Sequence, residues 1–251
     1  MSDKPSVIRE TDDEARKLAR VLLRTAGYAA LAVIDPDNGF PAASRVLLGT
    51  DIDSVPVILV SALSAHTRAL SRDPRASLLV GEPGRGDPLA HPRLTVQCIA
   101  ERVDRTTPTH GRLRARFLSR HPKAKRYIDF ADFTFLRLRP LSASLNGGFG
   151  KAYLLPGEDL EIRSPANEAI ANDADAIVRD LVLCHSDLIA EFTGKLNSGV
   201  PQRWRISGID AGGFDVITGK KTLRYDFYCH IEHYVDTKSY MSKVTYSMPL
   251  I

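Results

Sequence analysis

Residues His66–Val80, HTRALSRDPRASLLV, decide how the fold of this 251-residue chain is interpreted. In the second half, Asp73-Pro74 is typical of a turn and Ala76–Val80 is typical of a buried strand. The first half predicts a short helix over residues 66–72, directly after the apolar strand VPVILVSAL at residues 55–63. This helix opens on a His, a Thr and an Arg, three donors that packing alone does not require. Helix starts that hold an anion do need donors, because their first N–H groups lack partners.

Further donors lie around this strand-to-helix junction. Ser61 and Ser64 precede the helix, and Arg45 lies in the preceding strand, where it faces the same region if the two strands pair. Two basic groups and a helix start could together hold a phosphate dianion. From the residues alone a second interpretation stays open, in which Ser64 is only an N-cap and both Arg45 and Arg68 are surface charges.

Residues 1–155 favour a β-barrel or sandwich over a doubly wound sheet. An amphipathic helix over residues 10–25, with Thr11 and Glu14 as a capping box, precedes about six strands that show no regular βαβ alternation. The segment GGFG at residues 147–150 is not a GxGxxG motif and follows a strand of this barrel-like pattern, which excludes a dinucleotide-binding fold.

Residues 109–126 predict a second, strongly basic helix that Pro122 breaks or kinks. Its basic side chains suit either a solvated face or an electropositive rim for an anionic ligand. They are Arg112, Arg114, Arg116, Arg120, Lys123, Lys125 and Arg126.

The chain divides at residues 156–166, a polar linker that begins with Pro156-Gly157. Residues 167–251 predict a small accessory α+β domain. Apolar residues at steps of three and four indicate one helix over residues 169–196, and strands follow in WRISGID, FDVITG and KKTLRYDF.

Composition excludes several classes of protein. Residues 1–156 carry 24 lysines and arginines against 16 acidic residues, a net charge of +8, and the remainder carries a net charge of −4. The basic residues are scattered and match no nucleic-acid-binding motif, so we expect no nucleic-acid partner. No apolar run approaches the roughly 18 residues that span a bilayer, so we expect no membrane partner. The polar, acidic N-terminus is not a secretory signal, and three distant cysteines favour the reducing cytoplasm.

Metal and catalytic motifs are weak. His230 and His233 have a spacing that suits a metal only on a helix, so we predict no metal site. The common hydrolase and kinase motifs are absent, and no catalytic residue is assigned.

Two motifs together resemble the FMN-binding split-barrel proteins related to pyridoxamine 5′-phosphate oxidase: SRVLL at residues 44–48 and SxLSxHTRALxxDPRASLL at residues 61–79. Within that group, RHP, FADFxxxRLxP and GGFGKA, which lie between residues 120 and 152, are similar to the haem-utilisation, HugZ-like branch. The resemblance covers most of the chain. It implies an α+β protein with an N-terminal split β-barrel and a small C-terminal α+β domain. The tail at residues 228–251 departs from the helical ending of that branch.

The resemblance also implies a homodimer that binds FMN, a small-molecule ligand, in clefts between two barrels. Arg45 and Val46 would lie along the flavin and its phosphate, and Ser61 near the ring or ribityl chain. The helix start would face the phosphate, and Gln97 would touch the isoalloxazine edge. The implied cofactor-binding residues are Arg45, Val46, Ser61, His66, Thr67, Arg68 and Gln97.

Two departures from the oxidases matter. A neutral His66 stands where they use a permanent cation, which weakens the attraction for phosphate. Their C-terminal substrate motif is absent, which counts against pyridoxamine phosphate oxidation. Three hypotheses stay open: an FMN-dependent oxidoreductase of unknown substrate, a haem-binding or haem-degrading protein that uses the same cleft, and a non-catalytic ligand-binding protein. For haem, the candidate ligands are His66, His230 and His233.

Overall fold

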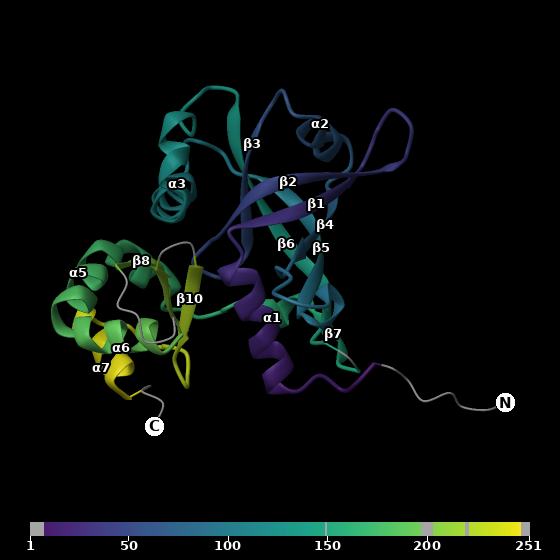
Figure 1. The fold of residues 1–251 in the computed structure, drawn as a ribbon. Helices are drawn as coiled ribbons and strands as arrows, with labels where there is room; N and C mark the ends of the chain where they lie inside the picture. Colours follow the sequence, from purple (N-terminus) through teal and green to yellow (C-terminus); the bar gives the residue numbers. More distant parts are fainter. Residues whose placement is uncertain (1–7, 149, 197–202, 219–220, 247–251) are drawn as a thin grey trace. The chain divides into compact units, whose positions relative to one another are not determined.

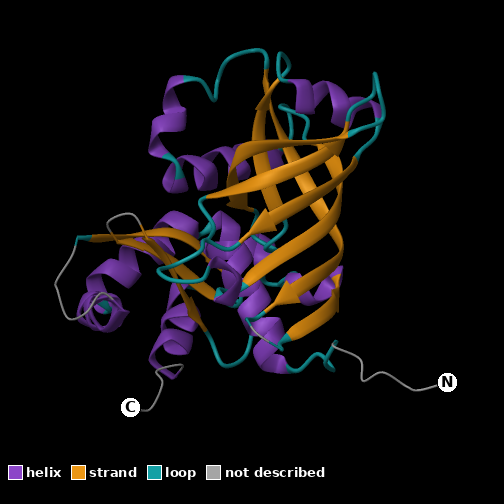
Figure 2. Cartoon of the chain, turned by 45° about the vertical axis from the view of Figure 1, so that its right-hand side comes forward, coloured by secondary structure: helices purple, strands orange, loops and turns teal. Residues whose placement is uncertain are grey.

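Neighbouring strands in the first part of the chain close into an antiparallel barrel (Figure 1, Figure 2). The computed structural model describes residues 8–148, 150–196, 203–218 and 221–246. Six strands form a ring in the order β3-β2-β1-β4-β5-β6, closed by pairing of β3 with β6, and β7 adds to β6. The predicted split-barrel fold is therefore confirmed. The strands are β1 Tyr28–Ile34, β2 Pro41–Thr50, β3 Pro56–Ser61, β4 Arg75–Val80, β5 Arg93–Arg102, β6 Phe133–Asn146 and β7 Ala152–Pro156.

Alternation along the strands separates a buried face from an exposed one, because successive side chains of a strand point to opposite sides. The barrel core contains Leu31, Leu48, Ile58, Leu78 and Leu94, all fully buried. On the opposite side, register partners on adjacent strands form an exposed row. The row runs through Arg45, Ala30, Leu79, Thr95, Ser144 and Leu154, and we call this side of the sheet the outer face.

Three helices pack against the barrel. The helices of this part are α1 Asp13–Thr25, α2 Ala65–Arg72 and α3 Pro108–Arg120, with the 3-10 segments η1 Pro88–Ala90, η2 Pro122–Arg126 and η3 Gly157–Leu160. Helix α3 lies on the outer side of β3 and β6, where Leu113 and Phe117 contact Val57 and Phe135. Helix α1 packs Ala15, Ala19 and Leu23 into the barrel core. The predicted capping box at its start is wrong: the Asp12 carboxylate accepts from Ala15 N–H, and the Thr11 hydroxyl donates to the carbonyl of Leu154.

The basic segment forms α3 and η2, and the break that Pro122 predicts lies between them. The structure corrects both interpretations of its charges for three arginines. Arg112 pairs with the buried carboxylate of Asp51, Arg116 donates to the carbonyl of Thr50, and Arg120 donates to the carbonyl of Ala26. These side chains fasten the helix to the barrel.

The chain divides into two compact units, Met1–Glu161 and Ile162–Ile251, and the division falls within residues 156–166. The second unit contains an antiparallel meander of β8 Trp204–Asp210, β9 Gly213–Thr218 and β10 Lys221–Asp226. The single helix predicted over residues 169–196 is wrong, because the backbone leaves the helical conformation at Asp173 and at His185. It forms α4 Asn167–Asn172, α5 Ala174–Cys184 and α6 Ser186–Leu196.

The tail contains α7, Thr237–Tyr246, so the expectation of a tail without a helical ending is corrected. Tyr240 of α7 is fully buried, and its hydroxyl lies within hydrogen-bonding distance of the carbonyls of Asp210 and Gly213. Arg224, also buried, forms ion pairs with Asp210 and Asp215. The described part of the tail, residues 228–246, therefore contributes to the core of the second unit. Among the residues described, no helix is long and apolar enough to cross a membrane.

Candidate functional site

A cavity of about 780 Å³ lies between α2 and the β1–β2 hairpin, and we call it the helix cavity. This volume is typical of small-molecule sites. The hairpin loop is fixed by local hydrogen bonds: the Asp35 carboxylate accepts from Asp37 N–H, and Gly39 N–H donates to the Asp35 carbonyl. Gly39 has φ +75°, a conformation that favours glycine. The cavity is lined by Val33, Ile34, Asp35, Pro36, Asp37, Gly39, Ala42, Ala43, Ser44, Ala65, His66, Arg68, Ala69, Ser71, Arg72 and Asp73.

His66 and Ser44 meet in the helix cavity. The Nδ1 atom of His66 lies 3.2 Å from the Oγ atom of Ser44, and both side chains are half-buried. Ser44 comes from β2, on the opposite side of the strand from Arg45, and therefore faces α2. Burial lowers the pKa of His66, so its imidazole is neutral at pH 7.

Charges on the helix cavity are divided between its two sides. Arg68 and Arg72 lie one turn apart on α2, and neither guanidinium has a carboxylate partner among the described residues. Asp35 and Asp37 lie on the hairpin side. The third carboxylate, Asp73, accepts hydrogen bonds from Arg75, which lower its pKa to about 2. An anion would therefore be held on the α2 side, at Arg68 and Arg72.

Two predicted donors are engaged elsewhere. The Ser61 hydroxyl donates to the Asp132 carboxylate at 2.6 Å, and the Thr67 hydroxyl donates to the Ser61 carbonyl at 2.7 Å. Neither residue lines the helix cavity. Ser64 is the N-cap residue of α2, but its side chain makes no capping hydrogen bond.

Arg45 and Val46 lie outside the helix cavity. The Arg45 guanidinium stands over the ring of Tyr28, 5.3 Å from its centroid, on the outer face. Val46 is buried in the barrel core. Of the seven predicted residues, the structure brings His66 and Arg68 together in this cavity.

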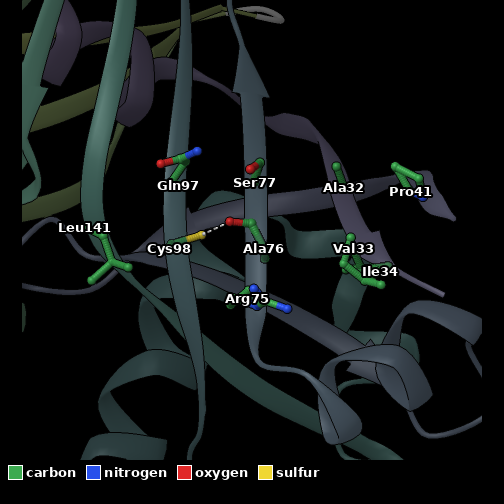
Figure 3. Close-up of a pocket in the computed structure, with 10 residues that line it drawn as sticks. All are labelled: Ala32, Val33, Ile34, Pro41, Arg75, Ala76, Ser77, Gln97, Cys98 and Leu141. Carbon is green, nitrogen blue, oxygen red and sulfur yellow. Dashed lines mark hydrogen bonds between the residues drawn. The ribbon is translucent and has the colours of Figure 1, made fainter. Parts of the chain in front are cut away.

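Gln97 lines a second cavity, of about 400 Å³, which we call the sheet cavity (Figure 3). Gln97 and Ser77 are register partners on β5 and β4, and the figure shows them side by side. The Gln97 side-chain oxygen accepts from the Ser142 hydroxyl at 2.9 Å. The other lining residues are Ala32, Val33, Ile34, Pro41, Arg75, Ala76, Cys98 and Leu141.

The two cavities share Val33 and Ile34, near the end of β1, but their chemistry differs. The thiol of Cys98 donates to the Ala76 carbonyl, and burial raises its pKa to about 12, so it is neither a ligand nor a nucleophile near pH 7. The sheet cavity offers an amide, a hydroxyl and the guanidinium of Arg75, which is paired with Asp73, whereas the helix cavity offers an imidazole and the guanidiniums of Arg68 and Arg72.

His230 and His233 belong to the second unit. His230 is half-buried, close to Gly212, and His233 is exposed. In the part of the chain that the structure describes, no group of three or more His, Cys, Asp or Glu side chains could hold a metal ion.

Sequence reasoning missed Ser44 and Arg72 as cavity residues. The signal for Arg72 was its spacing of four from Arg68, which puts both on one helix face. The signal for Ser44 was the alternation of β2, which turns it away from Arg45.

The chain is similar to known proteins in both sequence and structure. The family model described as "CREG, beta-barrel" matches residues 10–160. A crystal structure of an Agrobacterium tumefaciens C58 protein of unknown function is 28% identical with a TM-score of 0.78, over 97% of this chain and 100% of that one. A haem-binding protein from Mycobacterium smegmatis is 25% identical with a TM-score of 0.54, over 98% of this chain and 97% of that one.

A curated relative is the chloroplastic non-canonical heme oxygenase HOZ of Arabidopsis thaliana. It is 28% identical over 189 residues, which cover 74% of this chain and 56% of the relative. The chain therefore spans little more than half the length of the curated relative that it matches.

Proposed function

Since the chain belongs to the CREG β-barrel family of split-barrel proteins, we propose that it binds haem in the helix cavity and supports haem degradation by dioxygen and an external electron donor. One cavity combines a half-buried imidazole, two guanidiniums that have no carboxylate partner among the described residues, and apolar walls, and this combination supports the proposal. The haem-binding protein of Mycobacterium smegmatis and the heme oxygenase of Arabidopsis support the same ligand.

The cations of the cavity suit the two carboxylates of haem. Arg68 and Arg72 stand four residues apart on α2, where two like charges repel each other slightly. A dicarboxylate bound beside them relieves that repulsion and accepts charge-assisted hydrogen bonds. The walls near α2 and β1 are apolar, with Val33, Ala65 and Ala69 among them, and suit the body of a porphyrin.

His66 is the residue that we propose as the protein ligand to the iron. Its ring is half-buried and already held at Nδ1, which leaves Nε2 without a partner among the described residues. Histidine is a common haem ligand, and a held ring is typical of a ligating imidazole. When bound, haem supplies the iron-centred redox chemistry, and the protein holds the carboxylates, orients the ring and limits water at the apolar walls.

FMN is the second candidate ligand, and one observation favours it. The sheet cavity presents the Gln97 amide beside the Ser77 hydroxyl, groups that could bond the polar edge of a flavin ring. Against FMN, the hydroxyls of Ser61 and Thr67, expected near the ribityl chain and the phosphate, donate within the protein.

We also propose that the protein is a homodimer whose contact is the outer face. Several large apolar side chains are exposed on this face, on β2, β4 and β7. Leu47 is 39% exposed, Leu79 is 46% exposed and Leu154 is 56% exposed. Exposed large apolar side chains on one face favour a contact with another protein surface, and a second copy of the chain carries the same face.

Spectroscopic titration tests the proposal. Purified protein is titrated separately with haemin and with FMN, and the haemin complex is then given ascorbate in air and under argon. We expect a sharp Soret band that saturates with haemin and then decays only in air. Saturable binding of FMN without a haemin complex would replace the haem proposal by the flavin one. A stable haemin complex that survives ascorbate in air would support the non-catalytic hypothesis, and binding of neither compound would refute both ligands.

A further inference from the structure

Ser44 and His66 contact each other in the helix cavity. The Oγ atom of Ser44 and the Nδ1 atom of His66 lie 3.2 Å apart, and both side chains line the helix cavity. Ser44 lies on β2 and His66 on the first turn of α2, so the contact joins two walls of the cavity. Neither side chain has another hydrogen-bond partner among the described residues.

This contact can be made in two ways, and they give the cavity opposite properties. If Nδ1 carries the ring proton, it donates to Ser44 and Nε2 keeps a lone pair. If Ser44 donates to Nδ1, the ring proton lies on Nε2, which then becomes a hydrogen-bond donor. A lone pair at Nε2 suits a metal ion, whereas an N–H at Nε2 suits an anion.

The surroundings favour the first arrangement. The guanidiniums of Arg68 and Arg72 already supply several donors for an anion on the α2 side of the cavity. A further donor at His66 would add little to anion binding. A nitrogen lone pair, which could bind a metal ion, is a group that Arg68 and Arg72 cannot supply. The serine hydroxyl can accept from Nδ1 and still rotate its own proton toward solvent.

We propose that Ser44 is a positioning residue that accepts the Nδ1 proton of His66 and so fixes the tautomer whose Nε2 binds haem iron. The inference rests on the proposed haem function, which it deepens by naming the residue that prepares the ligand. Ser44 acts through His66 and touches the iron in no step. Hydrogen-bond partners of metal-ligating histidines commonly play this part, and their loss weakens metal binding about 10- to 100-fold.

The first experiment uses the full chain without haem. The ring nitrogens of His66 are observed by ¹⁵N NMR at a pH where the ring is neutral, and they are assigned by comparison with His66→Gln. In the wild type we expect the proton on Nδ1. In Ser44→Ala we expect a shift toward the Nε2–H tautomer, and in Ser44→Thr, which keeps the hydroxyl, a return to the wild-type spectrum.

The second experiment titrates the same proteins with haemin. Ser44→Ala should bind haemin at least about tenfold more weakly, with an altered Soret band, and Ser44→Thr should restore both. Ser242→Ala, which removes an exposed serine of α7 in the other unit, is the matched control and should behave as the wild type. A circular dichroism melt of each variant separates lost positioning from lost folding.

The outcomes separate the inference from the function on which it rests. If the wild type binds no haemin, the proposed function fails, and the inference fails with it. If haemin binds and His66→Ala abolishes the wild-type Soret band, but Ser44→Ala leaves affinity, spectrum and tautomer unchanged, the inference alone is overturned. A wild-type ring protonated at Nε2 overturns the inference whatever the affinity, because the Ser44 hydroxyl would then be the donor.

Discussion

Arg112 of α3 donates two hydrogen bonds to the buried carboxylate of Asp51, 2.8 Å from Nε to Oδ1 and 2.9 Å from Nη2 to Oδ2. Asp51 follows β2 and its side chain is fully buried, so the pair joins a surface helix to the barrel wall. Arg137 of β6 approaches the same carboxylate at 3.2 Å. The basic helix is therefore part of the scaffold, and Asp51 is the buried carboxylate that binds it to the barrel.

Replacing Asp51 should destabilise the barrel unit. In Asp51→Ala, the guanidiniums of Arg112 and Arg137 lose a carboxylate that is shielded from water. We expect the free energy of unfolding to fall by about 3 kcal/mol, the lower range for breaking a buried pair, because both arginines are partly exposed. Urea denaturation followed by circular dichroism measures it.

Asp129→Ala is the matched control, since Asp129 also receives two hydrogen bonds from an arginine of α3, Arg114. That pair is exposed and screened by water, so its loss should destabilise the unit much less than Asp51→Ala does. Equal losses in the two variants would contradict the scaffold role of Asp51.

The same carboxylate should make stability depend on acid. Burial, the largest single influence, raises the pKa of Asp51, but the hydrogen bonds and charge of Arg112, aided by Ile52 N–H and the Arg116 charge, outweigh it and lower the pKa. A carboxyl whose pKa is lower in the folded state adds stability above its unfolded pKa of about 4 and loses it as pH falls through the folded value. Stability should therefore fall as pH drops below about 4. Urea midpoints measured across this range should change less steeply in Asp51→Asn, and parallel curves would refute the assignment.

Removing the two cavity guanidiniums should weaken ligand binding. We expect Arg68→Ala combined with Arg72→Ala to reduce haemin affinity about tenfold, because charge-assisted hydrogen bonds to the haem carboxylates are lost and exposure keeps each small. Arg126→Ala removes an exposed arginine of η2 outside the cavity and serves as control. Fluorescence quenching by haemin gives the affinities, and an unchanged double variant would mean that the carboxylates bind elsewhere.

A charge on the outer face should separate the proposed dimer. Leu79→Glu places a carboxylate on the outer face, beside Ala30 of β1, where a second copy would desolvate it. We expect the variant to be a monomer in multi-angle light scattering, with the wild type a dimer. Leu63→Glu alters a more exposed leucine in the turn after β3, outside this face, and should stay dimeric. A wild-type monomer, or a dimeric Leu79→Glu, would reject the outer face as the contact.

Local patterns in the sequence predicted the elements around His66 well. The turn at Asp73-Pro74, the strand that follows and the short helix before it depend on neighbouring residues, and all three are present. The break at Pro122 is local in the same sense, because the ring of proline removes an N–H and restricts the backbone. The barrel followed because strands at close spacing leave little room for crossover helices.

Long-range partners explain what could not be predicted. Nothing near Thr67 shows that its hydroxyl turns inward, and nothing near Ser61 shows that its hydroxyl donates a hydrogen bond to Asp132, 71 residues later. The role of Arg112 depends likewise on Asp51, 61 residues earlier. In the second unit, the apolar periodicity continues through Asp173 and His185, so the pattern alone gave one helix where the chain turns twice.

The thiol of Cys98 is buried and its pKa is raised to about 12, and this has a practical consequence. The two other cysteines, Cys184 and Cys229, are exposed and both belong to the second unit. A maleimide dye or spin label applied to the native protein should therefore attach to that unit alone. Its movements could be followed without engineering a cysteine-free background, while the cavities of the barrel stay unlabelled.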